Sequence, residues 1–239
     1  MTAFTWREGH LAIDLPAASV VFTTRRGGES AAPYDTLNLG LWTEDDPGAV
    51  AENRRRLADP HGLALLSTHQ VHGTDVVRAE RAHDSLPDAD GHATATPGLA
   101  PLVVTADCLP VAVAADGAVA VLHCGWRGLA GGIVAEGVRA VRELGGDGEV
   151  HAAIGPGAGP CCYEVGDEVR AAFAAHGDAV RRGRRIDLKA IAARELEAAG
   201  AVAVHDTAQC TICGDPALWF SHRREGARTG RQGGMAWLR

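Results

Sequence analysis

The segment 102–126, LVVTADCLPVAVAADGAVAVLHCGW, decides the fold because it contains two almost continuous apolar runs joined by Asp116-Gly117. Short runs of small and β-branched residues are typical of buried strands, and Asp-Gly between two such runs is a strong β-hairpin signal. We therefore predict that 102–115 and 118–126 form two buried, neighbouring strands.

Strands and helices alternate irregularly on both sides of this hairpin. Strands are predicted at 20–28, 67–80, 150–156, 201–206 and the C-terminal GMAWL, a short extended piece at 38–42, helices at 46–62, 127–146, 163–177 and 187–200, and a loop at 88–98. This order favours an α+β fold with a mixed sheet packed with helices over a doubly wound parallel sheet. The length of 239 residues predicts a single domain, 1–239.

Composition and charge exclude several classes of protein. The chain is 46% hydrophobic and carries 23 basic against 30 acidic residues, a balance that does not favour nucleic-acid binding. No apolar run is long enough to span a membrane, and the first residues do not resemble a signal peptide. We therefore expect a cytoplasmic protein with free thiols, which binds neither nucleic acid nor membrane and is a monomer or a homodimer.

Polar residues interrupt the apolar runs at three places, which contain His72, Cys108 and His123. Burying such groups costs about 1–3 kcal/mol or more unless they are paired or ligated. In a tight hairpin Cys108 and His123 are expected to lie almost opposite each other on the two strands, offset by about one residue pair. His72, at the edge of a third strand, could complete a triangle.

Two imidazoles and a thiolate suit Zn²⁺, which in catalytic sites takes three protein ligands and leaves one position for water or substrate. Copper is also compatible with these ligand types. A bound ion would lower the pKa of water and so could generate a nucleophile. Each residue taken singly is also compatible with a hydrogen-bonded core histidine or a buried thiol.

Several motifs resemble one known family. They are HQVHGTDV (69–76), TADCLPV (105–111), HCGWRGL (123–129), IGPGAGPCCYEVG (154–166) and the tail from CTIC (210–213) to the end of WFSHRREGARTGRQGG (219–234). In this order they resemble the laccase-domain family of purine nucleoside phosphorylases, whose members have also been called multicopper polyphenol oxidases and peptidoglycan editing factors. The resemblance implies a laccase-domain fold, similar to the catalytic domain of a bacterial cytotoxic necrotizing toxin.

The same resemblance implies a function and a set of ligands. The family's metal ligands correspond to His72, Cys108 and His123, which would also be the catalytic residues. The implied activity is phosphorolysis of adenosine, inosine and methylthioadenosine, together with deamination of adenosine to inosine. The ligand types favour zinc, with copper possible, and the implied partners are purine nucleosides and phosphate.

Phosphorolysis needs a cationic site for phosphate, and arginine suits it through bidentate hydrogen bonding. The candidates are Arg25-Arg26, Arg127 and Arg223-Arg224. Either pair could equally be solvated surface charge, whereas Arg127, at the predicted start of a helix, is disfavoured by the helix dipole unless it has an anionic partner. Asn38 interrupts an apolar stretch and could contact substrate or stabilise a turn. The resemblance places His69 near the pocket, although on a strand it would face away from His72.

The remaining cysteines give weaker signals. A redox or nucleophilic role is possible for Cys161-Cys162, but a structural loop turning into a helix is favoured. Cys210 and Cys213 have CxxC spacing, yet no second pair with that spacing completes a structural zinc site. Asp107, next to Cys108, is predicted to point to the opposite strand face, so a structural role is at least as good as a catalytic one.

Three other functions compete with the nucleoside enzyme. A copper-dependent polyphenol oxidase fits the older family name, but a multicopper cluster needs many more histidines. A cysteine hydrolase would use Cys108 as nucleophile and His123 as base, and it would survive chelation. The fourth interpretation is a non-catalytic metal-binding or peptidoglycan-editing factor.

Overall fold

The predicted hairpin consists of β8 (Leu109–Asp116) and β9 (Ala118–Cys124), which lie in the middle of a six-stranded sheet. Gly117 between them has a φ of 85°, in the left-handed region that glycine adopts without steric cost. The computed structural model describes residues 3–82 and 86–239. Within them it confirms the hairpin and its position in the core.

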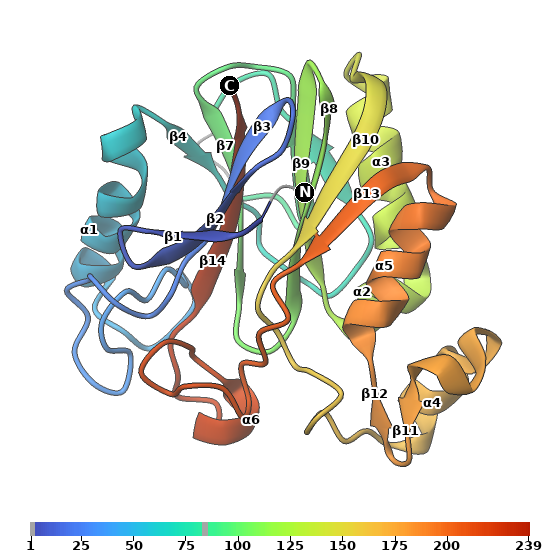
Figure 1. Ribbon diagram of the computed structural model, residues 1–239. Helices are drawn as coiled ribbons and strands as arrows, with labels where there is room; N and C mark the ends of the chain where they lie inside the picture. The colour runs from blue at the N-terminus through green and yellow to red at the C-terminus, as the bar shows by residue number, and fades with distance from the viewer. Residues whose placement is uncertain (1–2, 83–85) are drawn as a thin grey trace.

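Two mixed sheets pack face to face, and helices cover both outer faces (Figure 1). The first sheet has the order β1-β2-β3-β14-β7-β4 and the second has the order β13-β10-β8-β9-β6-β5. The pairs β10–β13, β4–β7 and β5–β6 are parallel, and the other pairs in the two sheets are antiparallel. The predicted α+β class with mixed sheets is therefore confirmed.

The elements have the following bounds. The strands of the first sheet are β1 Thr5–Arg7, β2 His10–Asp14, β3 Ala18–Phe22, β4 Ala64–Leu66, β7 Leu99–Thr105 and β14 Gln232–Leu238. The other strands of the second sheet are β5 Val76–Arg78, β6 Gly91–Thr94, β10 Asp147–Ile154 and β13 Ala201–Asp206, and a small hairpin is formed by β11 Arg181–Arg182 and β12 Arg185–Ile186. The helices are α1 Pro47–Ala58, α2 Trp126–Gly131, α3 Ile133–Glu143, α4 Asp167–Ala172, α5 Leu188–Ala198 and α6 His222–Glu225, with 3-10 turns η1 Asp59–His61 and η2 Ala174–Val180.

The two faces of the central hairpin belong to different cores. Val111 and Leu122 pack with α3 and α5, whereas Ala112 and Val121 pack against the first sheet. Alternate residues of a strand point to opposite faces, so a strand buried on both faces has an almost unbroken apolar sequence. His123 is two residues after Val121 on the same strand, so its side chain also points toward the first sheet. It is the last residue of β9 on that face.

The prediction of one strand over 102–115 is wrong. The structure divides this segment into β7 of the first sheet and β8 of the second, with a break at 106–108. Asp107 has a φ of 94°, which an extended strand does not accommodate. The chain therefore crosses between the two sheets at the residue that precedes Cys108.

Other predictions also need correction. The segment 88–98 is not a continuous loop, because Gly91–Thr94 forms the fully buried strand β6 beside β9. The helix predicted at 127–146 is interrupted at Gly132, whose φ is 92°. The helix predicted at 163–177 is reduced to α4 and a 3-10 turn. Composition and periodicity are local signals. They reveal neither the pairing of β6 with β9 nor the left-handed glycine that interrupts the helix.

Two extended segments are shorter or absent. The segment 38–42 is not a strand, and 67–80 contributes only β5 and an isolated bridge at His69. Within 3–82 and 86–239, every helix falls short of the length and hydrophobicity needed to cross a bilayer.

A matched pair of valine substitutions tests the assignment of the core. Val113, in the middle of β8, is 0% exposed, whereas Val202 on the edge strand β13 is 59% exposed. We expect Val113→Ala to lower the free energy of unfolding by about 2–3 kcal/mol, because it removes two buried methyl groups and leaves a cavity. Val202→Ala should cost less than about 1 kcal/mol. Urea unfolding followed by circular dichroism measures both, and equal losses would contradict the assignment.

Candidate functional site

A cavity of about 420 Å³ opens where the two sheets end. The end of β7, the end of β9 and several loops form its walls. It is lined by Gly40, Leu41, Trp42, Thr43, Thr68, His69, Gln70, His72, Val104, Thr105, Ala106, Asp107, Cys108, His123, Tyr163, His222, Arg223 and Arg231. A larger cavity of about 470 Å³ lies elsewhere, between the N-terminal strands and α1, and contains none of the three residues predicted to bind metal.

The three predicted ligands His72, Cys108 and His123 meet in the smaller cavity. Their nearest nitrogen and sulfur atoms all lie within 4.8 Å of one another. The Sγ atom of Cys108 is 4.0 Å from Nε2 of His72, and the two imidazole rings meet edge to face with centroids 4.8 Å apart. Atoms at these separations can share one metal ion.

The crossing between the sheets positions Cys108. The strand partner of His123 is Pro110. Cys108 lies two residues before Pro110 in the sequence, one residue farther from the position opposite His123 than the hairpin prediction allowed. The backbone carbonyl of Asp107 accepts a hydrogen bond from the amide of Ala158 at 2.7 Å. The Asp107 carboxylate accepts hydrogen bonds from the Thr211 hydroxyl at 2.7 Å and the Arg223 amide at 2.8 Å. Asp107 thus fixes the turn that directs the thiol into the cavity.

One buried carboxylate, Asp90, positions both histidines. Asp90 is 0% exposed, and its Oδ1 lies 2.7 Å from Nδ1 of His123. The same carboxylate accepts backbone N–H bonds from Val71, His72 and Gly73 at 3.1, 2.9 and 2.6 Å. These bonds hold His72 at a φ of 62°, a left-handed conformation that is unfavourable for a residue with a side chain. Sequence reasoning missed Asp90 because 88–98 was predicted to be a loop.

The electrostatics of the site favour a thiolate. Burial opposes ionisation of Cys108, but the adjacent His123 and His72 lower the pKa of the thiol to about 6. Burial also opposes charge on His123, yet Cys108 and Asp90 raise its pKa to about 9. A thiolate is the form of cysteine that binds a metal ion, and a cation would compete with the proton for the lone pair of the His123 ring.

The trio fits a metal ion chemically and sterically. The hydrogen bond between Asp90 and Nδ1 of His123 leaves Nε2 as the ring nitrogen directed to the site, the usual arrangement behind a metal-bound histidine. A Cβ atom at Gly125 would lie 3.0 Å from the His72 ring and 3.2 Å from the Cys108 sulfur. Glycine at this position therefore leaves both ligands room to approach one ion.

Cationic and aromatic groups surround the opening of the cavity. Arg223 lies over the Tyr163 ring at 5.0 Å, and the His69 ring packs against Trp42 at 4.7 Å. Arg231, which sequence reasoning missed, also lines the cavity.

Two residues that line the cavity, Thr68 and Thr105, carry buried hydroxyl groups. The Oγ1 atoms of Thr68 and Thr105 have no hydrogen-bond partner among the described residues. A buried hydroxyl without a partner costs about 1–3 kcal/mol. Because these two oxygens have almost no exposed surface, a ligand could pair with them only after the cavity wall rearranges.

Three of the residues predicted to bind substrate are not among the described residues that line this cavity, namely Arg25, Asn38 and Arg127. The Arg25 side chain binds the Asp35 carbonyl at 2.7 Å and the Glu225 carboxylate at 2.9 Å. Arg127 is exposed and lies over the neighbouring Trp126 ring. Asn38 is fully buried, where it binds the backbone amides of Gly40 and Arg231 and so shapes the cavity wall from behind.

Comparison with known proteins identifies the family of the chain. A family model described as multi-copper polyphenol oxidoreductase laccase matches residues 19–239. The chain belongs to this family. The match includes all three members of the trio and Asp90.

Individual members of the family cover almost the whole chain. A protein of Pseudomonas aeruginosa named purine nucleoside phosphorylase is 43% identical, covering 94% of this chain and 96% of that protein. A Streptomyces coelicolor protein of the same name is 42% identical, with 91% and 94% covered. The crystal structure of Bacillus licheniformis YfiH superimposes with a TM-score of 0.90 at 29% identity, and each chain is covered to 99%.

Removing the charge of Asp90 tests its positioning role. Asp90→Asn keeps the size of the side chain but replaces one acceptor oxygen with a donor that faces backbone N–H groups. We expect metal affinity to fall about 10–100-fold, as for other groups that orient metal-bound histidines. Competition with a chromophoric chelator measures the affinity, and circular dichroism checks folding.

The matched control is Asp88→Asn. Asp88 binds Nδ1 of His69 at 2.7 Å, at the exposed opening of the cavity. Its substitution should leave metal affinity close to that of the wild type. Equal affinities of folded Asp90→Asn and Asp88→Asn proteins would refute the role of Asp90.

Proposed function

We propose that this protein is a cytoplasmic, zinc-dependent purine nucleoside phosphorylase that also deaminates adenosine. The convergence of His72, Cys108 and His123 at a cavity with cationic and aromatic walls carries this proposal. The names of the Pseudomonas and Streptomyces relatives support the substrate class.

The trio would hold zinc through two imidazole nitrogens and one thiolate. When bound, zinc supplies a Lewis acid that polarises water or substrate beside it. Asp90 keeps the His123 ring in the tautomer and orientation needed for ligation. Since three residues hold the ion and all three line the cavity, a fourth position would remain for a further small group.

The cavity has the size and lining for a nucleoside. Its volume of about 420 Å³ is within the range of small-molecule sites. Trp42 and Tyr163 offer aromatic faces for a purine base.

Phosphorolysis requires an anion next to the sugar, and Arg223 and Arg231 provide the positive charge. A phosphate oxygen attacks C1′ of the ribose, and the bond between C1′ and the base nitrogen breaks with its electron pair passing to the purine. The base takes up a proton, and the products are free purine and ribose 1-phosphate. The arginines would stabilise the phosphate during attack.

Deamination of adenosine would use the same cavity. Water adds to C6 of the adenine ring, and the amino group leaves as ammonia, so that inosine is formed. Because this reaction consumes water rather than phosphate, the two activities can be separated by leaving phosphate out.

A copper-dependent polyphenol oxidase is the alternative suggested by the family description. Copper accepts imidazole and thiolate ligands. Within the described residues, however, the histidine-containing cluster has three members, and the other cluster that could hold a metal consists of cysteines. A multicopper cluster needs more histidines than this arrangement provides, so we favour one mononuclear zinc site.

A cysteine hydrolase is favoured by one observation. The order Asp90–His123–Cys108, with the carboxylate on one ring nitrogen and a lowered thiol pKa, is the arrangement of an acid–base–nucleophile triad. Chelation separates the two functions, since a cysteine hydrolase keeps its activity without metal and a metalloenzyme loses it.

Product analysis with adenosine tests the proposed function. Zinc-loaded protein should produce inosine without phosphate, and adenine plus ribose 1-phosphate when phosphate is present. Cys108→Ala should abolish both activities and zinc binding in the pocket, because it removes one of three ligands. Chromatography identifies the products. The absence of both products with zinc-loaded wild type, or a fully active Cys108→Ala protein, would contradict the proposal.

Two arginine substitutions test the phosphate site. Arg223→Gln should raise the KM for phosphate about tenfold, equivalent to about 1.4 kcal/mol, while changing phosphate-independent deamination little. Arg127→Gln, at an exposed position outside the lining of the cavity, is the control and should leave both activities close to wild type. Equal effects of the two substitutions on the KM for phosphate would exclude Arg223 from the site.

A further inference from the structure

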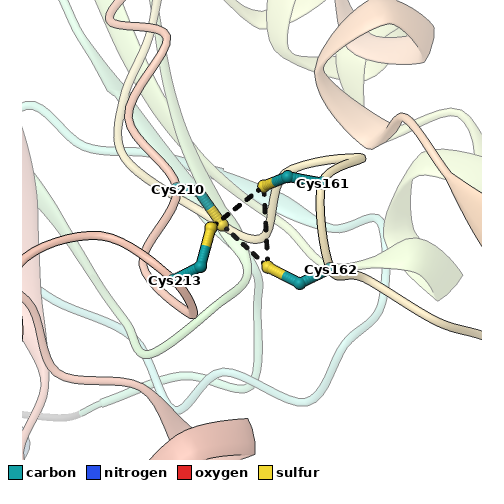
Figure 2. A group of neighbouring side chains, drawn as sticks. All are labelled: Cys161, Cys162, Cys210 and Cys213. Carbon is teal, nitrogen blue, oxygen red and sulfur yellow. Dashed lines mark hydrogen bonds between the residues drawn. The ribbon is translucent and has the colours of Figure 1, made fainter.

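Four cysteines from two distant parts of the chain meet outside the His72–Cys108–His123 cluster (Figure 2). Cys161 and Cys162 belong to the loop after β10, and Cys210 and Cys213 belong to the loop after β13. Figure 2 shows that the four side chains point toward a common centre. Their sulfurs all lie within 4.8 Å of one another.

The sulfur separations suit a single tetrahedral ion. The Sγ atoms of Cys161 and Cys213 are 3.2 Å apart, those of Cys162 and Cys210 are 3.4 Å apart, and those of Cys161 and Cys162 are 3.5 Å apart. Four thiolates that each lie about 2.3 Å from one ion are about 3.8 Å from one another. A small outward movement of the thiols would therefore complete the tetrahedron.

Other chemistries fit the arrangement less well. A disulfide needs its sulfurs about 2.05 Å apart, and all four cysteines are free. A cluster of several irons distributes its cysteine ligands over separate metal atoms, which places the sulfurs farther apart. Four sulfurs around one point are typical of a structural zinc site.

Glycines next to the four cysteines allow the two loops to pack closely. The amide of Gly159 donates a hydrogen bond to Cys210 Sγ at 3.2 Å, a contact that stabilises a thiolate. A Cβ atom at Gly159 would lie 3.2 Å from the Cys161 sulfur, and one at Gly214 would lie 2.2 Å from the Cys210 carbonyl oxygen. Glycine at both positions allows the two loops to bring their thiols together.

We propose that Cys161, Cys162, Cys210 and Cys213 bind a second zinc ion, which has a structural role. With all four positions taken by sulfur, this site has no place for water or substrate. The sequence-based view that CTIC lacks a second pair overlooked Cys161-Cys162, whose spacing differs from CxxC. The proposal does not depend on the function proposed for the cavity.

The expected role of the second ion is to join two loops that position residues of the cavity. Cys162 is followed by Tyr163, which lines the cavity, and Thr211 between Cys210 and Cys213 holds Asp107 through its hydroxyl. The Thr211 amide also binds the Gly157 carbonyl at 3.0 Å, which links the two loops directly. An ion shared by both loops would stabilise this contact.

Metal analysis of the full-length chain tests the second site. A variant without the first cluster (His72→Ala, Cys108→Ala and His123→Ala together) should retain one zinc per chain, with four sulfur neighbours by X-ray absorption. In the wild-type background, Cys210→Ser with Cys213→Ser should lower the zinc content by one ion per chain. Cys124→Ala, which removes a buried thiol outside both clusters, is the control and should keep the wild-type content.

Loading the same proteins with cobalt provides a second, spectroscopic measurement of the ligands. An ion held by four thiolates gives strong sulfur-to-cobalt charge-transfer bands, and these should persist in the variant without the first cluster and disappear in the Cys210→Ser, Cys213→Ser variant. Nitrogen or oxygen among the ligands of the second ion would overturn the proposal. So would freshly purified wild type that contains two disulfides among these cysteines, or a zinc content unchanged by the double serine substitution.

Discussion

The site depends on one buried carboxylate. Asp90 binds three consecutive backbone amides of the His72 loop and the ring of His123, with no exposed surface of its own. A charge in such a position is tolerated because every oxygen is hydrogen-bonded. The residue lies immediately before β6, and its own carbonyl accepts the His123 amide at 2.7 Å. Pairing of β6 with β9 therefore brings the loop, the histidine and the carboxylate into register together.

The position of the cavity follows from the crossing between the sheets. β7 and β8 are consecutive in sequence but belong to different sheets, and the turn between them carries Cys108. Two packed sheets bury their inner faces against each other, yet at their ends the apolar side chains give way to polar ones. The thiol at the crossing and the histidine at the end of β9 thus meet where the inter-sheet core stops.

The two candidate metal clusters differ in ways that suit different roles. The first combines nitrogen and sulfur ligands in the lining of an open cavity, which suits the proposed catalytic ion. The second surrounds its centre with four sulfurs and leaves no open position, which suits the proposed structural ion. Asp107 and Thr211 connect the two, since their hydrogen bond joins the turn of Cys108 to the loop of Cys210.

The sequence by itself determined the hairpin, the α+β class and the identity of the three residues that converge, because apolar periodicity and buried polar interruptions are local signals. It did not reveal the break at Asp107, the strand hidden in 88–98, or Asp90, since each depends on pairing with chain far away in sequence. The union of Cys161-Cys162 with Cys210 and Cys213 was likewise decided by the tertiary structure: the parallel pairing of β10 with β13 places the loops that follow them at the same edge of the sheet. Local composition does not predict this proximity, because the two cysteine pairs are far apart in the sequence and come together only in the folded chain.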